Sequence, residues 1–167
     1  PPTFTTVPDD LTFECEEGTY DVAAFDGCTA VTIDESREVI SEDGCGNYVH
    51  LVTLTASDEC GNEVSHIFTI TVEDTESPIW DQTMPGDLSI GCGELEDAEL
   101  YAATDACDGA IDVDFAEEII GEAGCAAGFT VIRTWTATDC TGNESVATQE
   151  IVVSDSGAPE WAMEIPA

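Results

Sequence analysis

The chain has 167 residues, and its 37 Asp and Glu residues against two Lys and Arg give a formal net charge of −35 at pH 7. So acidic a chain is repelled by nucleic-acid phosphates and by anionic membrane surfaces, which excludes both as partners and argues against membrane insertion. A hydrophobic content of 43% argues for a folded core rather than disorder.

Four extended segments are expected in the first half of the chain, at 10–15, 30–34, 48–57 and 65–74. They alternate apolar and polar residues, are rich in Val, Ile, Thr and aromatic residues, and are bounded by Gly, Asn and Asp, which is typical of β-strands. The second half shows the same series at 87–92, 110–115, 129–138 and 147–155. One further segment, 94–100, is compatible with a single helical turn.

The cysteines show that the two halves are repeats. Cys15, Cys28, Cys45 and Cys60 recur as Cys92, Cys107, Cys125 and Cys140, at offsets of 77, 79, 80 and 80. We therefore expect one domain at 1–76, a second at 77–157, and the start of a third repeat or a linker strand at 158–167. Acidic all-β repeats of this size with Pro-led junctions predict β-sandwiches joined end to end in a longer array.

Eight cysteines without a Cys-x-x-Cys pair favour disulfides over zinc or redox chemistry. Disulfides predict an oxidising compartment, so we expect an extracellular, cell-surface protein. The first residues show no signal segment, and no apolar run approaches the length of a membrane span. We interpret the chain as an excised or mature piece of a secreted protein.

The repeated motifs resemble a known family. A Pro-led start, an A-x-D-x-C turn, a long strand ending T-A-[ST]-D before G-N, and a closing D-[TS]-x-x-P resemble the hyalin repeat (HYR) family. They are most similar to the four-cysteine versions in large cell-surface adhesins and gliding-motility proteins of Bacteroidetes. The resemblance covers nearly the whole chain twice, and it implies an all-β fold of tandem immunoglobulin-like β-sandwich repeats, an adhesive or structural setting, and no catalytic chemistry.

Strand length narrows the disulfide pairing within each repeat. A strand over 48–57 spans about 30 Å, so Cys45 and Cys60 lie at opposite ends of the domain and cannot pair. The immunoglobulin-like order that the resemblance implies places Cys15 beside Cys45 and Cys28 beside Cys60. The expected disulfides are Cys15–Cys45, Cys28–Cys60, Cys92–Cys125 and Cys107–Cys140.

The same strand order places acidic residues where successive repeats meet. Calcium binds six to eight oxygen atoms of carboxylates, Asn side chains and carbonyls, and grouped carboxylates repel one another without a cation. We therefore expect Ca²⁺ between repeats, as in cadherin linkers, although the cadherin D-x-N-D-N motif is absent. A solvated acidic surface is the alternative explanation. The candidate ligands are Asp26, Asp58, Asn62, Asp74, Glu76, Asp105, Asp139, Asn143 and Asp155.

The remaining candidates for chemistry favour packing. His50 and His66 are replaced by Val131 and Ala147 in the second repeat, and without a further His, a Lys or a neighbouring Ser they form no catalytic or zinc constellation. No enzymatic activity is expected. Trp80 and Trp161 are interpreted as covers of the junctions between repeats, with carbohydrate stacking as the alternative.

These observations predict a mechanical role: the shaft of an adhesin, stalk or fibre, with neighbouring repeats as partners, stiffened by disulfides and calcium. One alternative is a module that binds carbohydrate, such as a cell-surface polysaccharide, or another cell-surface partner. The other is a subunit of a self-assembling extracellular filament, with 158–167 docked on a neighbouring chain.

Overall fold

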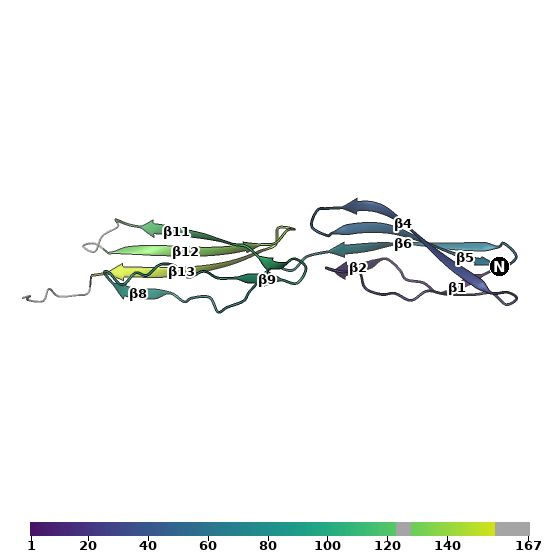
Figure 1. Cartoon of the computed structure of the whole chain (residues 1–167), viewed down its shortest axis with the longest axis horizontal. Coiled ribbons are helices and arrows are strands. Elements are labelled where there is room, and N and C mark those ends of the chain that lie inside the picture. The colour runs from purple at the N-terminus through teal and green to yellow at the C-terminus, as the bar shows by residue number, and fades with distance from the viewer. Residues whose placement is uncertain (123–127, 156–167) are drawn as a thin grey trace, which may run out of the picture. The chain divides into compact units, whose positions relative to one another are not determined.

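The structure is a computed structural model, and it describes residues 1–122 and 128–155. Cys125, Trp161 and the predicted third-repeat segment 158–167 lie outside these residues. The chain divides into two compact units, Pro1–Glu76 and Ser77–Ala167. Every regular element in the described residues is a β-strand (Figure 1). The described residues contain no helix long and apolar enough to cross a membrane.

Unit 1 contains two sheets. A long sheet has the strand order β2-β6-β5-β4, with β2 parallel to β6 and the other neighbours antiparallel, and β1 pairs with β3 in a short antiparallel sheet. The strands are β1 (Thr3–Thr6), β2 (Leu11–Glu14), β3 (Ala23–Phe25), β4 (Val31–Glu42), β5 (Tyr48–Asp58) and β6 (Glu63–Glu73).

Unit 2 repeats this arrangement. Its long sheet has the order β11-β12-β13-β8, again with a parallel pair between β8 and β13, and its short sheet has the order β10-β9-β7. The strands are β7 (Ile79–Trp80), β8 (Leu88–Gly91), β9 (Ala103–Asp105), β10 (Gly109–Ile111), β11 (Val113–Ile120), β12 (Phe129–Thr138) and β13 (Glu144–Ser154). The chain is therefore all-β, and each unit combines a long four-stranded sheet with a short sheet, as the predicted β-sandwiches require.

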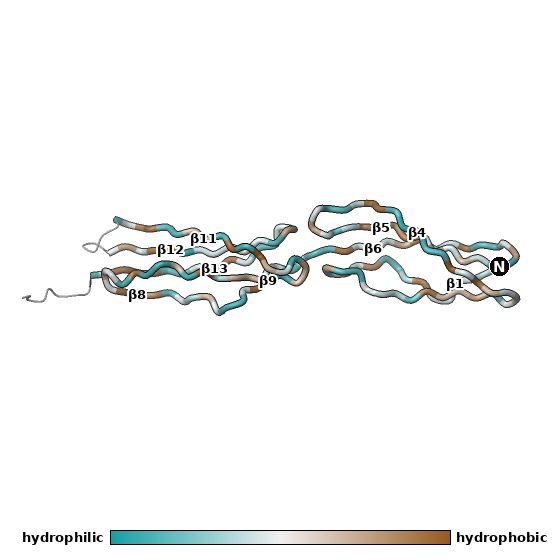
Figure 2. The backbone as a smooth tube through the Cα atoms, in the orientation of Figure 1, coloured by the Kyte–Doolittle hydropathy of each residue, from teal (hydrophilic) through white to brown (hydrophobic). Residues whose placement is uncertain are grey.

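The cores follow the alternating pattern of the two central strands of each long sheet. Over part of each of these strands every second residue is buried, and Figure 2 shows apolar and polar residues interleaved along them. Each fully buried aliphatic or aromatic side chain contributes about 1.5–3 kcal/mol to stability. The buried clusters are Val52, Leu54, Phe68, Ile70 and Val72 in unit 1, and Val131, Ile151 and Val153 in unit 2.

Two segments differ from the expectations for them. Segment 94–100 is not helical. Two of its backbone carbonyls accept hydrogen bonds from side chains of the sheet instead of from a helical turn. Arg133 Nη2 donates to the Glu96 carbonyl, and Trp135 Nε1 donates to the Glu99 carbonyl. The expected strand at 30–34 extends to Glu42 as β4. The charged residues of β4 obscure the alternation of apolar and polar residues by which a strand is recognised in the sequence. An exposed edge strand tolerates these charges, and β4 still pairs with β5 over its length.

The strands define two ends of each unit. The proximal end of unit 1 carries the β3–β4 turn and the β5–β6 turn, and that of unit 2 carries the β9–β10 and β12–β13 turns. The distal end of unit 1 carries the end of β2, the β4–β5 turn and the end of β6, and that of unit 2 carries the ends of β8 and β13. Each central strand runs the whole distance between the ends, which is about 33 Å for the ten residues of β12.

Candidate functional site

Asp105 ends β9 at the proximal end of unit 2 and closes the following turn. Its Oδ1 atom accepts hydrogen bonds from the backbone N–H groups of Cys107 (2.7 Å) and Asp108 (3.2 Å). Asp105 is only 4% exposed, and its second oxygen, Oδ2, is buried without a hydrogen-bond partner. A buried carboxylate oxygen without a donor is costly, so this atom is the chemical signal of the site.

Asp139 organises the neighbouring β12–β13 turn. Its Oδ1 atom accepts from Gly142 N (2.7 Å), Asn143 N (2.8 Å) and Thr141 Oγ1 (3.0 Å), and its Oδ2 atom accepts from Asn143 Nδ2 (2.8 Å). Burial raises the pKa of Asp139, but the donors, led by Asn143, outweigh burial and hold the pKa below its ordinary value. The carboxylate is therefore ionised at neutral pH.

Asp108 joins the two turns, because its Oδ2 atom accepts the Cys140 N–H at 2.6 Å. Asp105, Asp108 and Asp139 thus gather at one end of unit 2. The sequence predicts all three acids at this end of unit 2, although Asp108 is not among the candidate ligands named above. The signal was present, since the spacing Asp105-x-x-Asp108 is the spacing of a turn closed by its first side chain.

Unit 1 shows the same turn. Asp26 Oδ1 accepts from Cys28 N (2.8 Å) and Thr29 N (3.2 Å), as Asp105 Oδ1 does in unit 2. Its Oδ2 atom forms an ion pair with the Pro1 ammonium group at 3.1 Å. The Cys28 N–H and then this ammonium hold the pKa of Asp26 below its ordinary range.

Asp58 repeats the role of Asp139 in unit 1. It accepts from Cys60 N (2.9 Å) and Asn62 N (2.8 Å) through Oδ1, and from Asn62 Nδ2 (2.6 Å) through Oδ2. The Asn62 side chain is the main reason that the pKa of Asp58 lies below its ordinary value. Asp58 also raises the pKa of the Pro1 ammonium group, although less than Asp26 does, so both acids act on one cation.

The other predicted ligands lie at distal ends. Asp74 follows β6, is 7% exposed, accepts the Glu76 N–H at 3.2 Å and donates its own N–H to Asn47 Oδ1 at 2.9 Å. Asp155 directly follows β13. The meeting of Asp74 and Glu76 with the turns of unit 2 stays a prediction.

The cysteines divide into two states. Cys15, Cys45, Cys92, Cys107 and Cys140 are disulfide-bonded. Cys28 and Cys60 are exposed free thiols. The predicted Cys28–Cys60 bridge is therefore wrong, although both residues lie at the expected end of unit 1. The predicted Cys92–Cys125 bridge involves a residue outside the described part of the chain.

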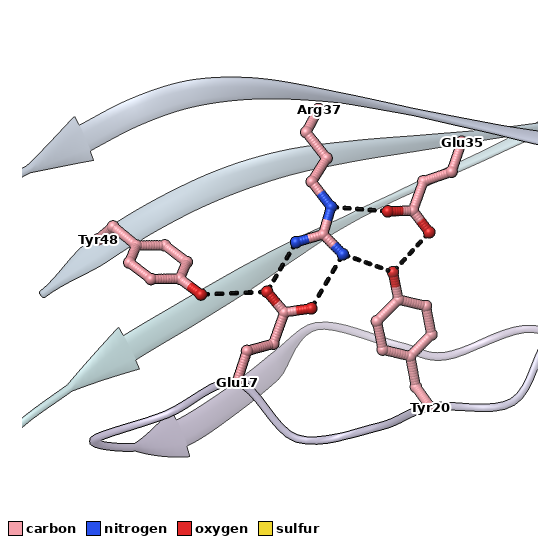
Figure 3. Close-up of polar contacts among 5 residues, drawn as sticks. All are labelled: Glu17, Tyr20, Glu35, Arg37 and Tyr48. Carbon is pink, nitrogen blue, oxygen red and sulfur yellow. Dashed lines mark hydrogen bonds and ion pairs between the residues drawn. The ribbon is translucent and has the colours of Figure 1, made fainter. Parts of the chain in front are cut away.

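Arg37 forms a polar network in unit 1 that the sequence did not predict (Figure 3). Its guanidinium donates to both carboxylate oxygens of Glu17 (2.6 and 2.9 Å) and to Glu35 (2.6 Å). Tyr20 and Tyr48 donate hydroxyl hydrogen bonds to Glu35 and Glu17. Arg37 holds the pKa of Glu17 below its ordinary value, whereas burial raises that of Tyr20. The network fastens the segment after β2 to the long sheet.

Unit 2 contains a cavity of about 290 Å³ between the segment after β8 and the long sheet. Arg133 and Trp135 lie on the sheet side, with Tyr101 and acidic residues, including Glu96, on the other. Arg133 donates from Nε to Glu117 at 2.9 Å and from Nη2 to the Glu96 carbonyl. Arg133 thus fastens the segment after β8 to the long sheet of unit 2, as Arg37 fastens the segment after β2 in unit 1.

The two histidines take packing positions. His66 donates from Nε2 to the Pro8 carbonyl at 2.8 Å and stacks on Phe68, and the His50 ring stacks on Tyr48 with 4.3 Å between centroids. Trp80 on β7 is partly buried and lies opposite Ala103. Its counterpart Phe4 lies opposite Ala24 and packs against the core of unit 1.

No protein-family model matches the chain, and no curated protein matches it significantly. Solved structures with a similar fold include EC1-4 of Drosophila N-cadherin (12% identity, covering 91% of this chain and 49% of that chain, TM-score 0.40). They also include human protocadherin-24 EC1-2 (12%, 93% and 99%, 0.37) and the Ig1-2 module of Drosophila receptor protein tyrosine phosphatase DLAR (12%, 92% and 98%, 0.33). The chain spans about half the length of the N-cadherin fragment. We draw no functional conclusion from similarities this remote.

Proposed function

We propose that this chain contributes two immunoglobulin-like repeats to the shaft of an extracellular adhesin, stalk or fibre of the hyalin-repeat type, stiffened by disulfides and by calcium between repeats. The observation that carries the proposal is the recurrence of one unit with the same turns at its proximal end: Asp26 and Asp105 close one turn, and Asp58 and Asp139 close the other. A unit repeated with matching ends suits a linear array. The bonded cysteines fit an oxidising, extracellular compartment.

Calcium is supported by the chemistry of the proximal end of unit 2. Asp105 offers a buried carboxylate oxygen without a hydrogen-bond partner. A cation therefore fits the position, and a hard carboxylate oxygen suits Ca²⁺. Asp108 also offers a carboxylate at this end. Asp139 Oδ1 already accepts three hydrogen bonds, whereas Oδ2 accepts one, so Oδ2 is the oxygen of Asp139 with more room for a cation.

Asp74 and Glu76 complete the proposed ligand set from the preceding unit. Both belong to the segment that follows β6 and leads into unit 2. A bound Ca²⁺ would offset the mutual repulsion of these acids, and it would supply a connection between units that is lost with the ion. The shaft would then bend more freely after chelation.

Thermal unfolding tests the calcium site. Extracellular calcium modules bind at about 10⁻⁴–10⁻³ M, so 10 mM Ca²⁺ is expected to raise the melting temperature by about 3 °C over chelator at matched ionic strength. Asp105→Asn keeps the turn acceptor but removes the charge, and it should abolish most of this rise. Asp114→Asn, an exposed acid on β11, is the control that should keep the rise. A wild-type melting temperature that is equal in Ca²⁺ and in chelator contradicts the calcium proposal.

Small-angle scattering tests the shaft itself. For the wild-type chain we expect a narrow distribution of particle dimensions in Ca²⁺ and a broader one in chelator. For Asp105→Asn we expect a broad distribution in both buffers. The same broad distribution for wild type in both buffers would contradict a calcium-stiffened shaft even if calcium binding were measured.

A glycan-binding module is the second candidate, and the cavity in unit 2 favours it. Trp135 and Tyr101 at this cavity, together with Arg133 and Gln149, combine apolar and hydrogen-bonding groups as sugar sites do. A glycan array with the whole chain separates the candidates. Binding that is lost in Tyr101→Ala would support this function, while an array without binding supports the shaft alone.

A further inference from the structure

Two buried positions of the long sheet carry apolar residues in unit 1 and polar residues in unit 2. Val52 on β5 pairs with Phe68 on β6, and both side chains belong to the core of unit 1. The residues 81 positions later are Arg133 and Gln149, which pair in the same way on β12 and β13. Arg133 is 7% exposed and Gln149 is 4% exposed. Unit 2 thus buries a cation and an amide where unit 1 buries a valine and a phenylalanine.

The exchange coincides with a cavity. In unit 1 the Phe68 ring contacts the Tyr20 ring, with 5.4 Å between centroids, and Phe13 packs against the same core cluster. In unit 2 Arg133 and Gln149 line the cavity of about 290 Å³. Buried polar groups and a cavity each lower the stability of a core. A core that has both, at positions where the other repeat packs apolar side chains, is typical of a binding site.

Arg133 and Gln149 each present one group that no described residue binds. Arg133 donates from Nε to Glu117 and from Nη2 to the Glu96 carbonyl, but no described residue accepts a hydrogen bond from Nη1. Gln149 donates from Nε2 to the Gly86 carbonyl at 2.8 Å, but no described residue donates to Oε1. The cavity lining therefore offers a charged donor and a neutral acceptor on adjacent strands. Neighbouring hydroxyl groups of a ligand satisfy both, because each hydroxyl donates and accepts.

The other walls fit one sugar ring. The Tyr101 ring meets the Trp135 ring edge to face, with 5.1 Å between centroids, and both line the cavity together with Ile90 and Leu95. Such apolar walls suit the C–H faces of a sugar, and the few polar groups fix its orientation. The volume of about 290 Å³ lies near the lower end of the range for small-molecule sites, about 300–1,000 Å³. The cavity therefore fits a single monosaccharide residue.

The exposed part of the lining is acidic. It consists of Glu94, Glu96, Asp97 and Glu99. No described residue donates a hydrogen bond to the carboxylates of Glu96 and Asp97, so both are available to a ligand. Arg133 is already paired with Glu117 and does not balance these charges. An anionic sugar is therefore repelled from the cavity, whereas a protonated amino group is attracted to it.

We propose that the cavity of unit 2 binds one amino sugar residue, with hydroxyl groups on Arg133 Nη1 and Gln149 Oε1 and the protonated amino group beside Glu96 and Asp97. The proposal rests on the glycan-binding candidate described above and specifies its ligand class. It is independent of calcium, because none of the proposed calcium ligands lines the cavity.

Ligand-observed NMR titration of the whole chain tests the ligand class. D-glucosamine, D-glucose and D-glucuronate are titrated separately in chelator at about pH 6, where the amino group is protonated. We expect glucosamine to bind about threefold more tightly than glucose, as an exposed charge pair allows, and glucuronate not to bind. Equal affinities for glucosamine and glucose would overturn the amino sugar and leave the glycan candidate standing. Absence of binding by all three would overturn the proposal, and a glycan array without binding would then remove the glycan candidate as well.

Two variants locate the ligand groups. Gln149→Met removes the amide at similar length, and it should lower the affinities for glucosamine and glucose by about tenfold. Glu96→Gln with Asp97→Asn keeps the shape and removes both charges, so it should lower the glucosamine affinity to that for glucose. Asp114→Asn with Glu118→Gln, exposed acids on β11 outside the cavity, is the matched control that should leave both affinities unchanged. A variant without the two rim charges that still prefers glucosamine would contradict the position of the amino group.

Thermal unfolding separates lost binding from lost folding. Gln149→Met should melt within about 5 °C of wild type. The changes at Glu96 and Asp97 are on exposed side chains, so they test the proposal whatever the stability of Gln149→Met. Arg133→Val with Gln149→Phe gives unit 2 the residue pair of unit 1, and it should bind neither sugar. Glucosamine binding by this folded variant with wild-type affinity would overturn the site.

Discussion

Arg133 on β12 lies opposite Glu117 on β11, and its Nε atom donates to the Glu117 carboxylate at 2.9 Å. In unit 1 the corresponding cross-strand pair is Val52 on β5 and Arg37 on β4. Both units therefore place their single arginine at the same pair of positions, but on opposite strands. In each unit the cation fastens the segment that follows the first strand of the long sheet, through Glu17 in unit 1 and the Glu96 carbonyl in unit 2.

Removing the buried cation should destabilise unit 2. We expect Arg133→Met to lower the free energy of unfolding by about 2 kcal/mol, because Glu117 and the Glu96 carbonyl lose a charged donor. Glu117→Leu combined with Arg133→Met should recover most of this loss, since an apolar pair replaces a broken ion pair at little cost. Urea unfolding measures both variants. A double variant no more stable than the single one would contradict the assignment.

The Arg37 network should make part of the stability of unit 1 depend on pH. Because Arg37 lowers the pKa of Glu17 in the folded state, this carboxylate stabilises the fold above its ordinary pKa of about 4.3. The contribution is lost as the pH falls through the folded pKa. Wild type should exceed Glu17→Gln by about 1 kcal/mol at pH 7, since Glu17 and Arg37 are partly exposed.

Unfolding of both proteins between pH 7 and pH 3 checks this expectation. The difference between wild type and Glu17→Gln should narrow toward zero in the acidic samples. A difference that stays constant across this range would mean that the charge of Glu17 does not contribute.

The net charge of −35 predicts a strong dependence on monovalent salt. Like charges repel across the folded surface, and salt screens this repulsion over a Debye length of about 10 Å at 0.1 M. Raising NaCl from 10 to 500 mM in chelator should increase the melting temperature by about 5 °C. A melting temperature that falls or stays constant would show that the charges are already compensated within the fold.

Two glycines with positive φ provide a matched pair of substitutions. Gly142 has a φ of 97° and open space where a Cβ would lie, whereas Gly128 has a φ of 72° and a Cβ there would lie 3.0 Å from the Val153 carbonyl oxygen. Gly142→Ala should cost about 1 kcal/mol for the backbone alone. Gly128→Ala should cost more because it adds a steric clash, and equal losses in thermal unfolding would contradict this reasoning.

The sequence by itself determined the all-β character, the repeat and the central strands, because alternation of Val, Ile and Thr with polar residues is a local property of each strand. It also identified Asp58 and Asp139, whose turns are closed by Asn62 and Asn143 a few residues away. It did not reveal the full length of β4, where pairing with β5 outweighs a charged local sequence.

Only the tertiary structure decided which polar side chains and thiols have a bonding partner and which have none. It left Asp105 Oδ2 buried without a hydrogen-bond partner, brought Asp108 to Cys140 across 32 positions of sequence, and showed Cys28 and Cys60 as free thiols. The Arg37 network likewise joins residues from separate segments. These features depend on distances between turns that are remote in sequence, and local residue patterns contain no information on those distances.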